Sequence, residues 1–282
     1  MYKPVLVTGA SSGIGEATAV HLAHKGFKVF ASARRLEKLK PLEGLGNRLI
    51  TAIEMDVSDE GSIASAIERI MSHSGNIYGV VNNAGVAVTG PMEELPIDEW
   101  RRQFETNVFG LVAVTKAVLP FMREEGRGRI VNVGSVAGRL AAPFQSAYAS
   151  SKHAVEGLTD SLRREVEPFG LHVSLIRPGF INTTFGEQEQ LGFERYAVEG
   201  GPYTRALDAF RAWHAKGHPD GASPHEVAEA IHHALTAARP HSRYTVPSQY
   251  LPALALRNIA PSWITDRLFK RTTGLNKVPN PK

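Results

Sequence analysis

The sequence predicts a doubly wound α/β domain, in which helices cover both faces of a mainly parallel β-sheet. Short runs of β-branched and other apolar residues alternate along the chain with segments whose apolar residues recur at helical spacing. The first run leads through a glycine-rich turn directly into a helix, an opening typical of doubly wound sheets. No repeat or interdomain linker interrupts this pattern, so we expect a single domain over residues 1–282.

Composition restricts the class of protein. A hydrophobic fraction of 43% and a charged fraction of 21% are those of a globular chain. The 32 Lys and Arg residues exceed the 28 Asp and Glu residues without forming a basic block, which predicts no nucleic-acid partner. Cysteine is absent, which excludes disulfides and thiolate ligands, and we expect no metal site. No apolar run approaches about 18 residues and the first strand begins at once, so we expect a cytoplasmic protein without a transmembrane helix or signal peptide.

The first predicted strand, 4–8, is followed by the turn Gly9-Ala-Ser-Ser-Gly13-Ile-Gly15 and a helix to about Lys25. This arrangement places backbone N–H groups at a helix N-terminus, where they can bind a phosphate. The spacing T-G-x-x-x-G-x-G differs from G-x-G-x-x-G, so the general dinucleotide fingerprint fits only loosely. The alternative is a plain glycine-rich loop without a ligand.

Two further strands are predicted at 28–32 and 49–54. An enzyme that prefers NAD is expected to carry Asp or Glu about 20 residues beyond the glycines, but Arg34 stands there. We interpret Arg34 as a ligand for a 2′-phosphate, against the alternative of a solvated surface arginine. Asp56 follows the third strand and has two compatible interpretations, a ligand contact or the N-cap of a helix that begins near Ser58.

A fourth strand is predicted at 77–81, and the turn Asn82-Asn83-Ala84-Gly85 follows it. A long helix is then predicted over about 98–122, with Asn107 in its interior. Asparagine is a poor helix former because its side chain competes for backbone hydrogen bonds. Its place inside this helix therefore indicates a functional use.

The chain is organised around the stretch from Ser135 to Lys152. A strand predicted at 129–134 ends at Ser135, and helical spacing begins at Tyr148. Tyr148 and Lys152 are four residues apart, so they project from one face of the first helical turn. Such a pair is suited to proton transfer, although lowering a tyrosine pKa from about 10 to about 7 to 8 takes roughly 3 to 4 kcal/mol. A lysine roughly 4 to 5 Å away supplies about that much at an effective dielectric constant of about 20.

Ser135 and the Y-x-x-x-K pair that begins thirteen positions later resemble the active site of short-chain dehydrogenases and reductases. The resemblance is close over about residues 1–185 and implies a seven-stranded Rossmann fold. It also implies hydride transfer between NADP(H) and an alcohol or carbonyl, with Tyr148 as general acid or base and Ser135 bonded to the substrate oxygen. Lys152 would bind the nicotinamide ribose and lower the pKa of Tyr148, and Asn107 would hold a water linked to Lys152.

The same resemblance assigns the cofactor contacts. Asp56 is implied to contact the adenine ring, with Val57 beside it, and the N-N-A-G turn to stabilise the central sheet. After a strand predicted at 171–176, the segment P-G-x-x-x-T resembles the family element that contacts the nicotinamide carboxamide. Together these motifs predict that NADP(H) is bound by Gly9, Ser11, Ser12, Gly13, Ile14, Gly15, Arg34, Asp56, Val57, Asn83, Ala84, Gly85, Tyr148, Lys152, Pro178, Gly179 and Thr183.

The last third of the chain is less regular. No period persists over 185–221, but its six aromatic residues argue against disorder, and the resemblance implies a helical lid over the substrate. A capping box at Ser223 predicts a helix to about Ala237, and 244–247 reads as a last strand. The extension over about 249–282 mixes apolar and basic residues; we expect a helix on the body or on a neighbouring subunit, with a membrane-surface patch as the alternative.

The expected substrate is a small lipophilic alcohol, ketone or aldehyde, because the segment 140–144 and the aromatic lid offer few polar groups. In its overall look the chain is similar to the steroid and retinol dehydrogenase branch of the family. We expect a homodimer or homotetramer. Two alternatives stay open: reduction of a 3-oxoacyl thioester, which would need a basic surface near the mouth of the site, and a non-catalytic NADP-binding regulator.

Overall fold

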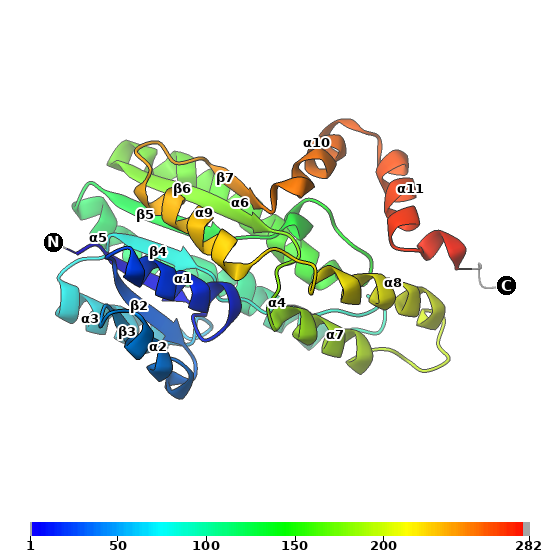
Figure 1. Cartoon of the computed structure of the whole chain (residues 1–282), viewed down its shortest axis with the longest axis horizontal. Helices are drawn as coiled ribbons and strands as arrows, with labels where there is room; N and C mark the ends of the chain where they lie inside the picture. The colour runs from blue at the N-terminus through cyan, green and yellow to red at the C-terminus, as the bar shows by residue number, and fades with distance from the viewer. Residues whose placement is uncertain (1, 279–282) are drawn as a thin grey trace.

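The computed structural model describes residues 2–278 and contains one seven-stranded parallel β-sheet (Figure 1). The strand order is β3-β2-β1-β4-β5-β6-β7, so the order reverses between β1 and β4, where doubly wound sheets bind their ligands. Every predicted strand forms, with ends shifted by two residues or fewer. The strands are β1 (Pro4–Thr8), β2 (Lys28–Ala33), β3 (Ile50–Glu54), β4 (Gly79–Asn82), β5 (Gly128–Val133), β6 (Leu171–Pro178) and β7 (Arg243–Val246).

Helices cover both faces of this sheet, as predicted. Successive side chains of a strand point to opposite faces, and β1 shows the result. Val5 and Val7 pack with α1 and α9, whereas Leu6 packs with α3 and α5. The helices of these two layers are α1 (Gly13–His24), α2 (Lys40–Leu45), α3 (Glu60–Ser74), α4 (Ile97–Phe104), α5 (Gly110–Glu124), α6 (Ser146–Val166) and α9 (Pro224–Thr236).

The helix predicted over about 98–122 is interrupted at its centre. Between α4 and α5 lies a five-residue π-helical segment, Glu105–Phe109, and Asn107 is in its middle. Short π-helical segments inside α-helices occur mostly at functional sites. By length and composition alone, the whole stretch Ile97–Glu124 would be long and apolar enough to cross a membrane. Here its apolar side packs against the sheet, and Val114 is fully buried in that layer.

Two helices occupy the region in which no sequence period was found, α7 (Phe185–Arg195) and α8 (Thr204–Gly217). They lie side by side beyond one end of the sheet (Figure 1). Their contact is a small aromatic cluster in which Phe193, Leu207 and Phe210 are fully buried. The buried residues of α8, Leu207, Phe210 and His214, do have helical spacing. Because His214 is polar, the sequence shows no period of apolar residues there.

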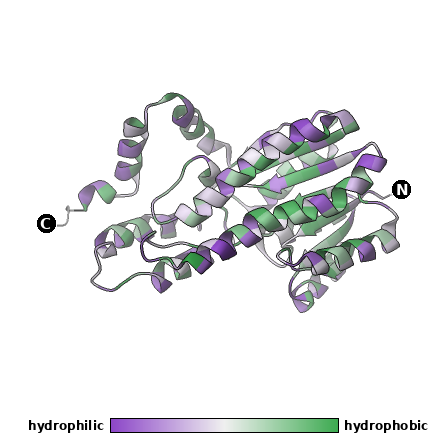
Figure 2. Ribbon diagram, turned by 180° about the vertical axis from the view of Figure 1, so that it is seen from behind, coloured by the Kyte–Doolittle hydropathy of each residue, from purple (hydrophilic) through white to green (hydrophobic). Residues whose placement is uncertain are grey.

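The C-terminal extension forms two helices, α10 (Leu251–Ile259) and α11 (Ser262–Thr272), rather than one. They arch away from the sheet in Figure 1, and Figure 2 shows hydrophobic and hydrophilic residues mixed along them. Ile259 is 81% exposed and Trp263 is 66% exposed. The expected packing on the body is therefore limited, and the part of the extension beyond residue 278 lies outside the described residues.

Candidate active site

The glycine-rich turn adopts a conformation that side chains would block. Gly9 has φ of +65°, and a Cβ atom added to Gly15 would lie 2.3 Å from the carbonyl oxygen of Gly9. The amide of Asn83 clamps the turn from the next strand, donating to the carbonyl oxygens of Thr8 and Gly9 at 3.0 and 3.1 Å. The turn is thus fixed against the sheet, with the N-terminus of α1 at its end.

A cavity of about 670 Å³ runs from this turn along the carboxyl ends of the strands. It gathers residues from widely separated parts of the chain. Gly15 and Asn107 do not line it, and Gly15 instead allows the close contact inside the turn. The predicted residues that do line it are Gly9, Ser11, Ser12, Gly13, Ile14, Arg34, Asp56, Val57, Asn83, Ala84, Gly85, Ser135, Tyr148, Lys152, Pro178, Gly179 and Thr183.

One part of the cavity is rich in cations. Arg34 and Arg35 follow β2 and line it, both exposed, and Lys38 joins them from the short 3₁₀ turn Leu36–Lys38. Sequence reasoning missed Lys38, although a basic residue four positions after Arg34 was a usable signal. The group supplies three positive charges to this part of the cavity.

Asp56 lines the same part of the cavity. Its Oδ1 atom accepts hydrogen bonds from the backbone nitrogen of Ser58 at 3.0 Å and from the hydroxyl of Ser58 at 2.6 Å. The N-cap of α3 is Asp59, whose side chain accepts from the backbone nitrogens of Gly61 and Ser62. The capping interpretation of Asp56 is therefore wrong, because the helix begins three residues later than that interpretation required.

Ser135, Tyr148 and Lys152 come together where β5 ends and α6 begins. Ser135 is held in an extended conformation with its Oγ accepting from the backbone nitrogen of Ala137 at 3.1 Å. Lys152 donates from Nζ to the carbonyl oxygen of Val133 at 2.9 Å, and its Nζ lies 5.8 Å from the centre of the Tyr148 ring. Burial lowers the pKa of Lys152 to about 8. Below that pH the lysine remains a buried cation beside the phenol.

The phenol itself is held in its protonated form. Burial raises the pKa of Tyr148 well above its ordinary value, and the nearby Glu189 carboxylate raises it further. A hydrogen bond with Ser135 opposes these two effects but does not outweigh them. The expectation that Lys152 brings this pKa down to about 7 or 8 is therefore wrong, because burial has the largest effect on the phenol and raises its pKa.

Asn107 is buried, and its amide group is used within the protein. Its Oδ1 accepts from the backbone nitrogen of Val86 at 2.9 Å, and its Nδ2 donates to the carbonyl oxygen of Val86 at 3.0 Å. Nδ2 also donates to the hydroxyl of Ser151 at 3.2 Å. Asn107 thus reaches the residue next to Lys152, and the described residues contain no hydrogen bond between Asn107 and Lys152 itself.

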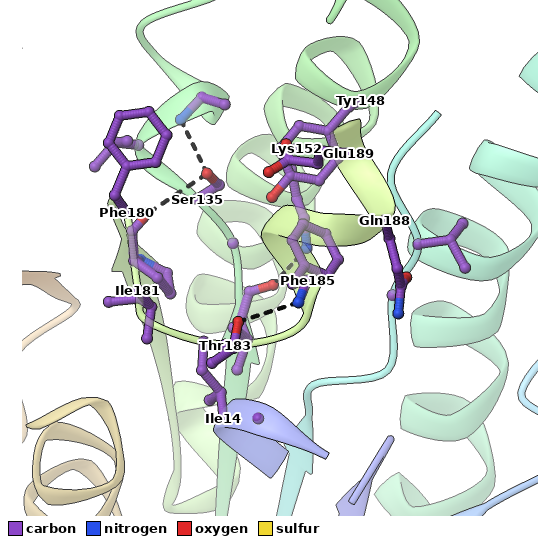
Figure 3. Close-up of a pocket in the computed structure, with 18 of the residues that line it drawn as sticks. Ile14, Ser135, Tyr148, Lys152, Phe180, Ile181, Thr183, Phe185, Gln188 and Glu189 are labelled. Carbon is purple, nitrogen blue, oxygen red and sulfur yellow. Dashed lines mark hydrogen bonds between the residues drawn. The ribbon is translucent and has the colours of Figure 1, made fainter. Parts of the chain in front are cut away.

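The wall opposite Ser135 and Tyr148 comes largely from the predicted lid region, 185–221, but sequence reasoning missed its polar residues Gln188, Glu189, His214 and His218. Figure 3 shows Phe180, Phe185, Gln188 and Glu189 around the same space as Ser135 and Tyr148. The ring centres of Phe185 and Tyr148 are 5.9 Å apart. Further out, the cavity is lined by Trp213 and His214 of α8, by His218, and by residues of α10 and α11.

Burial alone would raise the pKa of Glu189, but hydrogen bonds from His214 and His218 outweigh it and lower that pKa. Burial would likewise lower the pKa of His218, but the hydrogen bond to Glu189 and its charge raise it. The cavity wall therefore contains an ionised carboxylate that no local sequence motif predicts. The only signal was the four-residue spacing of His214 and His218 on a helix.

A parallel sheet with a glycine-clamped turn and a Ser-Tyr-Lys group at the ends of its strands defines a Rossmann-type oxidoreductase. The family model described as short chain dehydrogenase matches residues 3–192, and the chain belongs to this family.

Relatives match over most of their length. The uncharacterized oxidoreductase YusZ of Bacillus subtilis is 36% identical over 95% of this chain and 98% of its own. Retinol dehydrogenase 8 of Bos taurus is 37% identical over 96% of this chain and 89% of its own. The 3-ketodihydrosphingosine reductase of Bacteroides thetaiotaomicron is 39% identical over 66% of this chain and 67% of its own.

Solved structures agree with the fold. A short-chain dehydrogenase from Streptomyces avermitilis superposes with a TM-score of 0.80 at 31% identity, covering 99% of both chains. A family member from Burkholderia phymatum in complex with NAD has a TM-score of 0.79 at 27% identity, covering 91% of this chain and 93% of that one. A serine dehydrogenase complexed with NADP⁺ has a TM-score of 0.75 at 28% identity, covering 86% and 94%. Both dinucleotides thus occur among the structural neighbours.

Proposed function

We propose that this protein is an NADP(H)-dependent oxidoreductase that interconverts a lipophilic alcohol and its ketone or aldehyde. The observation that carries the proposal is a single cavity with Ser135, Tyr148 and Lys152 at the end of β5 and three cations, Arg34, Arg35 and Lys38, after β2. These two strands are separated by β1 and β4 in the sheet. A dinucleotide laid across this crossing would place its nicotinamide at the first group and its adenosine 2′-phosphate at the second.

The residues present fit such a cofactor. The glycines let the turn pack closely against Ala84 and Thr183, and backbone N–H groups at the start of α1 suit the pyrophosphate. Arginine suits a 2′-phosphate because its planar guanidinium offers several donors and stays charged. Thr183, Pro178 and Gly179 line the cavity on the nicotinamide side. When bound, the cofactor would supply the hydride, and the protein would supply position and charge.

Ser135, Tyr148, Lys152 and Asn107 would then handle the proton. Ser135 would hydrogen-bond the substrate oxygen, and Tyr148 would protonate it as the hydride arrives. The raised pKa of Tyr148 keeps that proton in place at neutral pH, which suits reduction better than oxidation. Lys152, fixed to the carbonyl oxygen of Val133, would bind the ribose and stabilise the phenolate once the proton has left. Asn107 would support α6 through its hydrogen bond to Ser151, and a water between Asn107 and Lys152 would be needed to complete the proton path.

A lipophilic substrate is supported by the outer wall, where Phe180, Phe185, Trp213, Leu268 and Phe269 line the cavity. Relatives named for retinol support the same class. A cytoplasmic location and a homo-oligomeric state stay predictions from the sequence.

A 3-oxoacyl thioester is the second candidate, and one observation favours it. The cavity mouth is bordered by α10 and α11, which carry Arg257, Arg267, Lys270 and Arg271 against a single acid, Asp266. This is the basic surface that an acidic carrier protein would need.

One assay tests both candidates. NADPH consumption is followed with lipophilic ketones and aldehydes, hydrophilic sugars of matched reactivity, and a 3-oxoacyl thioester on its carrier protein. We expect the highest kcat/KM with the lipophilic carbonyls. A preference for sugars would contradict the substrate class, a preference for the thioester would favour the second candidate, and tight NADPH binding without turnover would indicate a regulator.

A further inference from the structure

Glu189, His214 and His218 lie together in the cavity wall, and the hydride-transfer chemistry does not use them as reactants. His214 and His218 are four residues apart at the end of α8, so both imidazoles lie on one side, and Glu189 approaches from α7. The side chains of His214, His218 and Glu189 are 1%, 15% and 5% exposed, respectively. Charged and polar groups buried to this extent need hydrogen-bond or charge partners, and here the three side chains are partners of one another.

The three side chains converge on one point. Oε2 of Glu189 lies 2.9 Å from Nε2 of His218 and 3.4 Å from Nε2 of His214. One donor atom from each residue lies within 4.8 Å of the donor atoms of the other two. Among residues 2–278, no other set of His, Cys, Asp or Glu side chains gathers three such atoms this closely.

The outer nitrogens of both imidazoles are already held. Nδ1 of His218 lies 3.0 Å from the carbonyl oxygen of Ile181, which can only accept a hydrogen bond. Nδ1 of His214 lies 3.0 Å from the side-chain amide of Gln190, which can accept after a half-turn of that amide. With a proton on each Nδ1, loss of the Nε2 protons that hydrogen-bond to Glu189 would leave each Nε2 with a lone pair directed at the carboxylate. Histidine ligands of metals are oriented by outer partners in this way.

We propose that Glu189, His214 and His218 form a binding site for one divalent transition-metal ion of the Zn²⁺ type. Two imidazole nitrogens and one carboxylate oxygen are a ligand set that Zn²⁺ uses in proteins, with a fourth position left to water or substrate. Bond lengths of about 2.0 to 2.2 Å place such ligands roughly 3.3 to 3.5 Å apart. Oε2 already lies at that spacing from Nε2 of His214 and would move slightly away from Nε2 of His218, and the ligand nitrogens of the two histidines, which lie within 4.8 Å of each other, would adjust to it.

The same residues have a simpler explanation, a hydrogen-bonded ion pair that joins α7 to α8. In that arrangement a proton rather than a metal lies between His218 and Glu189, and Gln145 donates to the other carboxylate oxygen at 2.9 Å. The two explanations differ in one respect that can be measured. An ion pair keeps its protons when a metal ion is offered, whereas a metal site exchanges them for the ion and depends on all three ligands.

The test uses the full chain, freed of metal by dialysis against a chelator and titrated with Co²⁺, whose visible absorption reports its coordination. We expect one equivalent to bind with the strong absorption of a four-coordinate site, and Zn²⁺ to displace it. Loss of an outer partner alone typically costs about 10- to 100-fold in metal affinity, so His214→Gln and His218→Gln should each cost at least that. The matched control is His225→Gln, because His225 lies against His21, with Nε2 of His225 3.2 Å from Nδ1 of His21, in a separate group of imidazoles on α1 and α9. This variant should bind Co²⁺ like the unmodified chain.

Three outcomes would overturn the proposal: no Co²⁺ binding by the unmodified chain, binding that survives both His214→Gln and His218→Gln, or binding that is lost in His225→Gln. Circular dichroism and melting of each metal-free variant report whether it is folded. If a variant does not fold, X-ray absorption of the Co²⁺-loaded unmodified chain reads the ligands directly. Two imidazole nitrogens would support the site, and one or none would reject it.

Discussion

The two sides of the cavity are built by different means. On the cofactor side, residues 4–184, position is set by the backbone: strand ends, the positive-φ turn at Gly9, and the amide clamp from Asn83. On the cover, residues 185–221 and 249–278, position is set by side chains that meet across α7 and α8, the Phe193–Phe210 contact and the Glu189 cluster. The first kind of site is rigid before a ligand arrives, and the second can be changed by a few substitutions without disturbing the sheet.

Among the substitutions that test this difference between the two sides of the cavity, Tyr148→Phe is expected to have the largest effect. Tyr148→Phe removes the proton donor and keeps the ring, so turnover should fall by about 10² to 10⁴ while the Kd for NADPH stays within about threefold. Steady-state kinetics and NADPH titration measure the two quantities. Tyr250→Phe is the control, because Tyr250 also lines the cavity but has no proposed role in proton transfer. Its hydroxyl instead accepts from the backbone nitrogen of Phe180 at 3.4 Å. Near-normal turnover in Tyr148→Phe would remove the proposed chemistry.

Phe210→Ala tests whether the cover is a separate unit. The side chain is fully buried, and its removal should cost about 3 to 5 kcal/mol. We expect hydrogen exchange to rise in α7 and α8 and to stay unchanged in β1 and β4. Phe30→Ala is the matched change in the sheet, where the side chain is equally buried, and it should raise exchange throughout. If both variants gave the same exchange pattern, the two sides would be one cooperative unit.

Lys152→Met should stabilise the ligand-free protein while it lowers activity. The pKa of Lys152 is lowered from 10.5 to about 8, so the unfolded chain binds more protons between these values and stability rises with pH across that window. Below pH 8, burying the charged form of Lys152 destabilises the folded protein by about 3 kcal/mol. The hydrogen bond to Val133 offsets about 1 kcal/mol of that cost.

Denaturant unfolding should therefore show a gain of about 2 kcal/mol for Lys152→Met at pH 7 that falls steadily as the pH rises from about 8 to about 10.5. The exposed Lys116 of α5 is the control, since Lys116→Met should change little at any pH. A gain in Lys152→Met that did not depend on pH would show that charge burial is not its cause.

Cofactor choice should change through two residues on the rigid side. In Ala33→Asp with Arg34→Ser, a carboxylate accepts from the ribose hydroxyls and repels a 2′-phosphate, while a charged donor is lost. A charged hydrogen bond contributes about 1.5 to 3 kcal/mol, so the NADPH to NADH preference should shift by at least about ten- to a hundredfold. Fluorescence titration with both dinucleotides measures it. Tighter binding of NADH than NADPH by the unmodified chain would show that the interpretation of Arg34 is wrong.

The smallest effect is expected at Trp263 on α11. Because this side chain is 66% exposed, Trp263→Ala should change the free energy of unfolding by about 0.5 kcal/mol or less. Thermal melting measures the change. A loss above about 1 kcal/mol would mean that Trp263 is covered in solution, by a second subunit or by another surface, and the cover would then be less exposed than the isolated chain suggests.

The same contrast explains what the sequence could predict. The strands, the glycine turn and the Tyr148-Lys152 pair follow from local patterns, because each depends on neighbours a few residues away, whereas Ser135 joined that pair only through the family resemblance. The Glu189 cluster depends on contacts between α7 and α8, and neither residue type nor spacing fixes which helices meet. The raised pKa of Tyr148 was missed for the same reason, since it needs the burial and the carboxylate that the cover brings. Asp56 was ambiguous because Asp59, three residues on, is an equally good cap.

The order in which the cavity wall occurs along the chain has a consequence for synthesis. The last of the residues proposed to bind the cofactor is Thr183, whereas the last of the described residues to line the cavity is Thr272, 89 residues later. A ribosome adding about 5 to 20 residues per second delivers that last stretch roughly 4 to 18 seconds after the cofactor side. A dinucleotide that bound the emerging sheet would stabilise it by mass action before the substrate had a wall to bind against. The residues proposed to bind the cofactor are thus synthesised before the wall that encloses a substrate, and α9 and β7, which complete the sheet and its cover, follow between them.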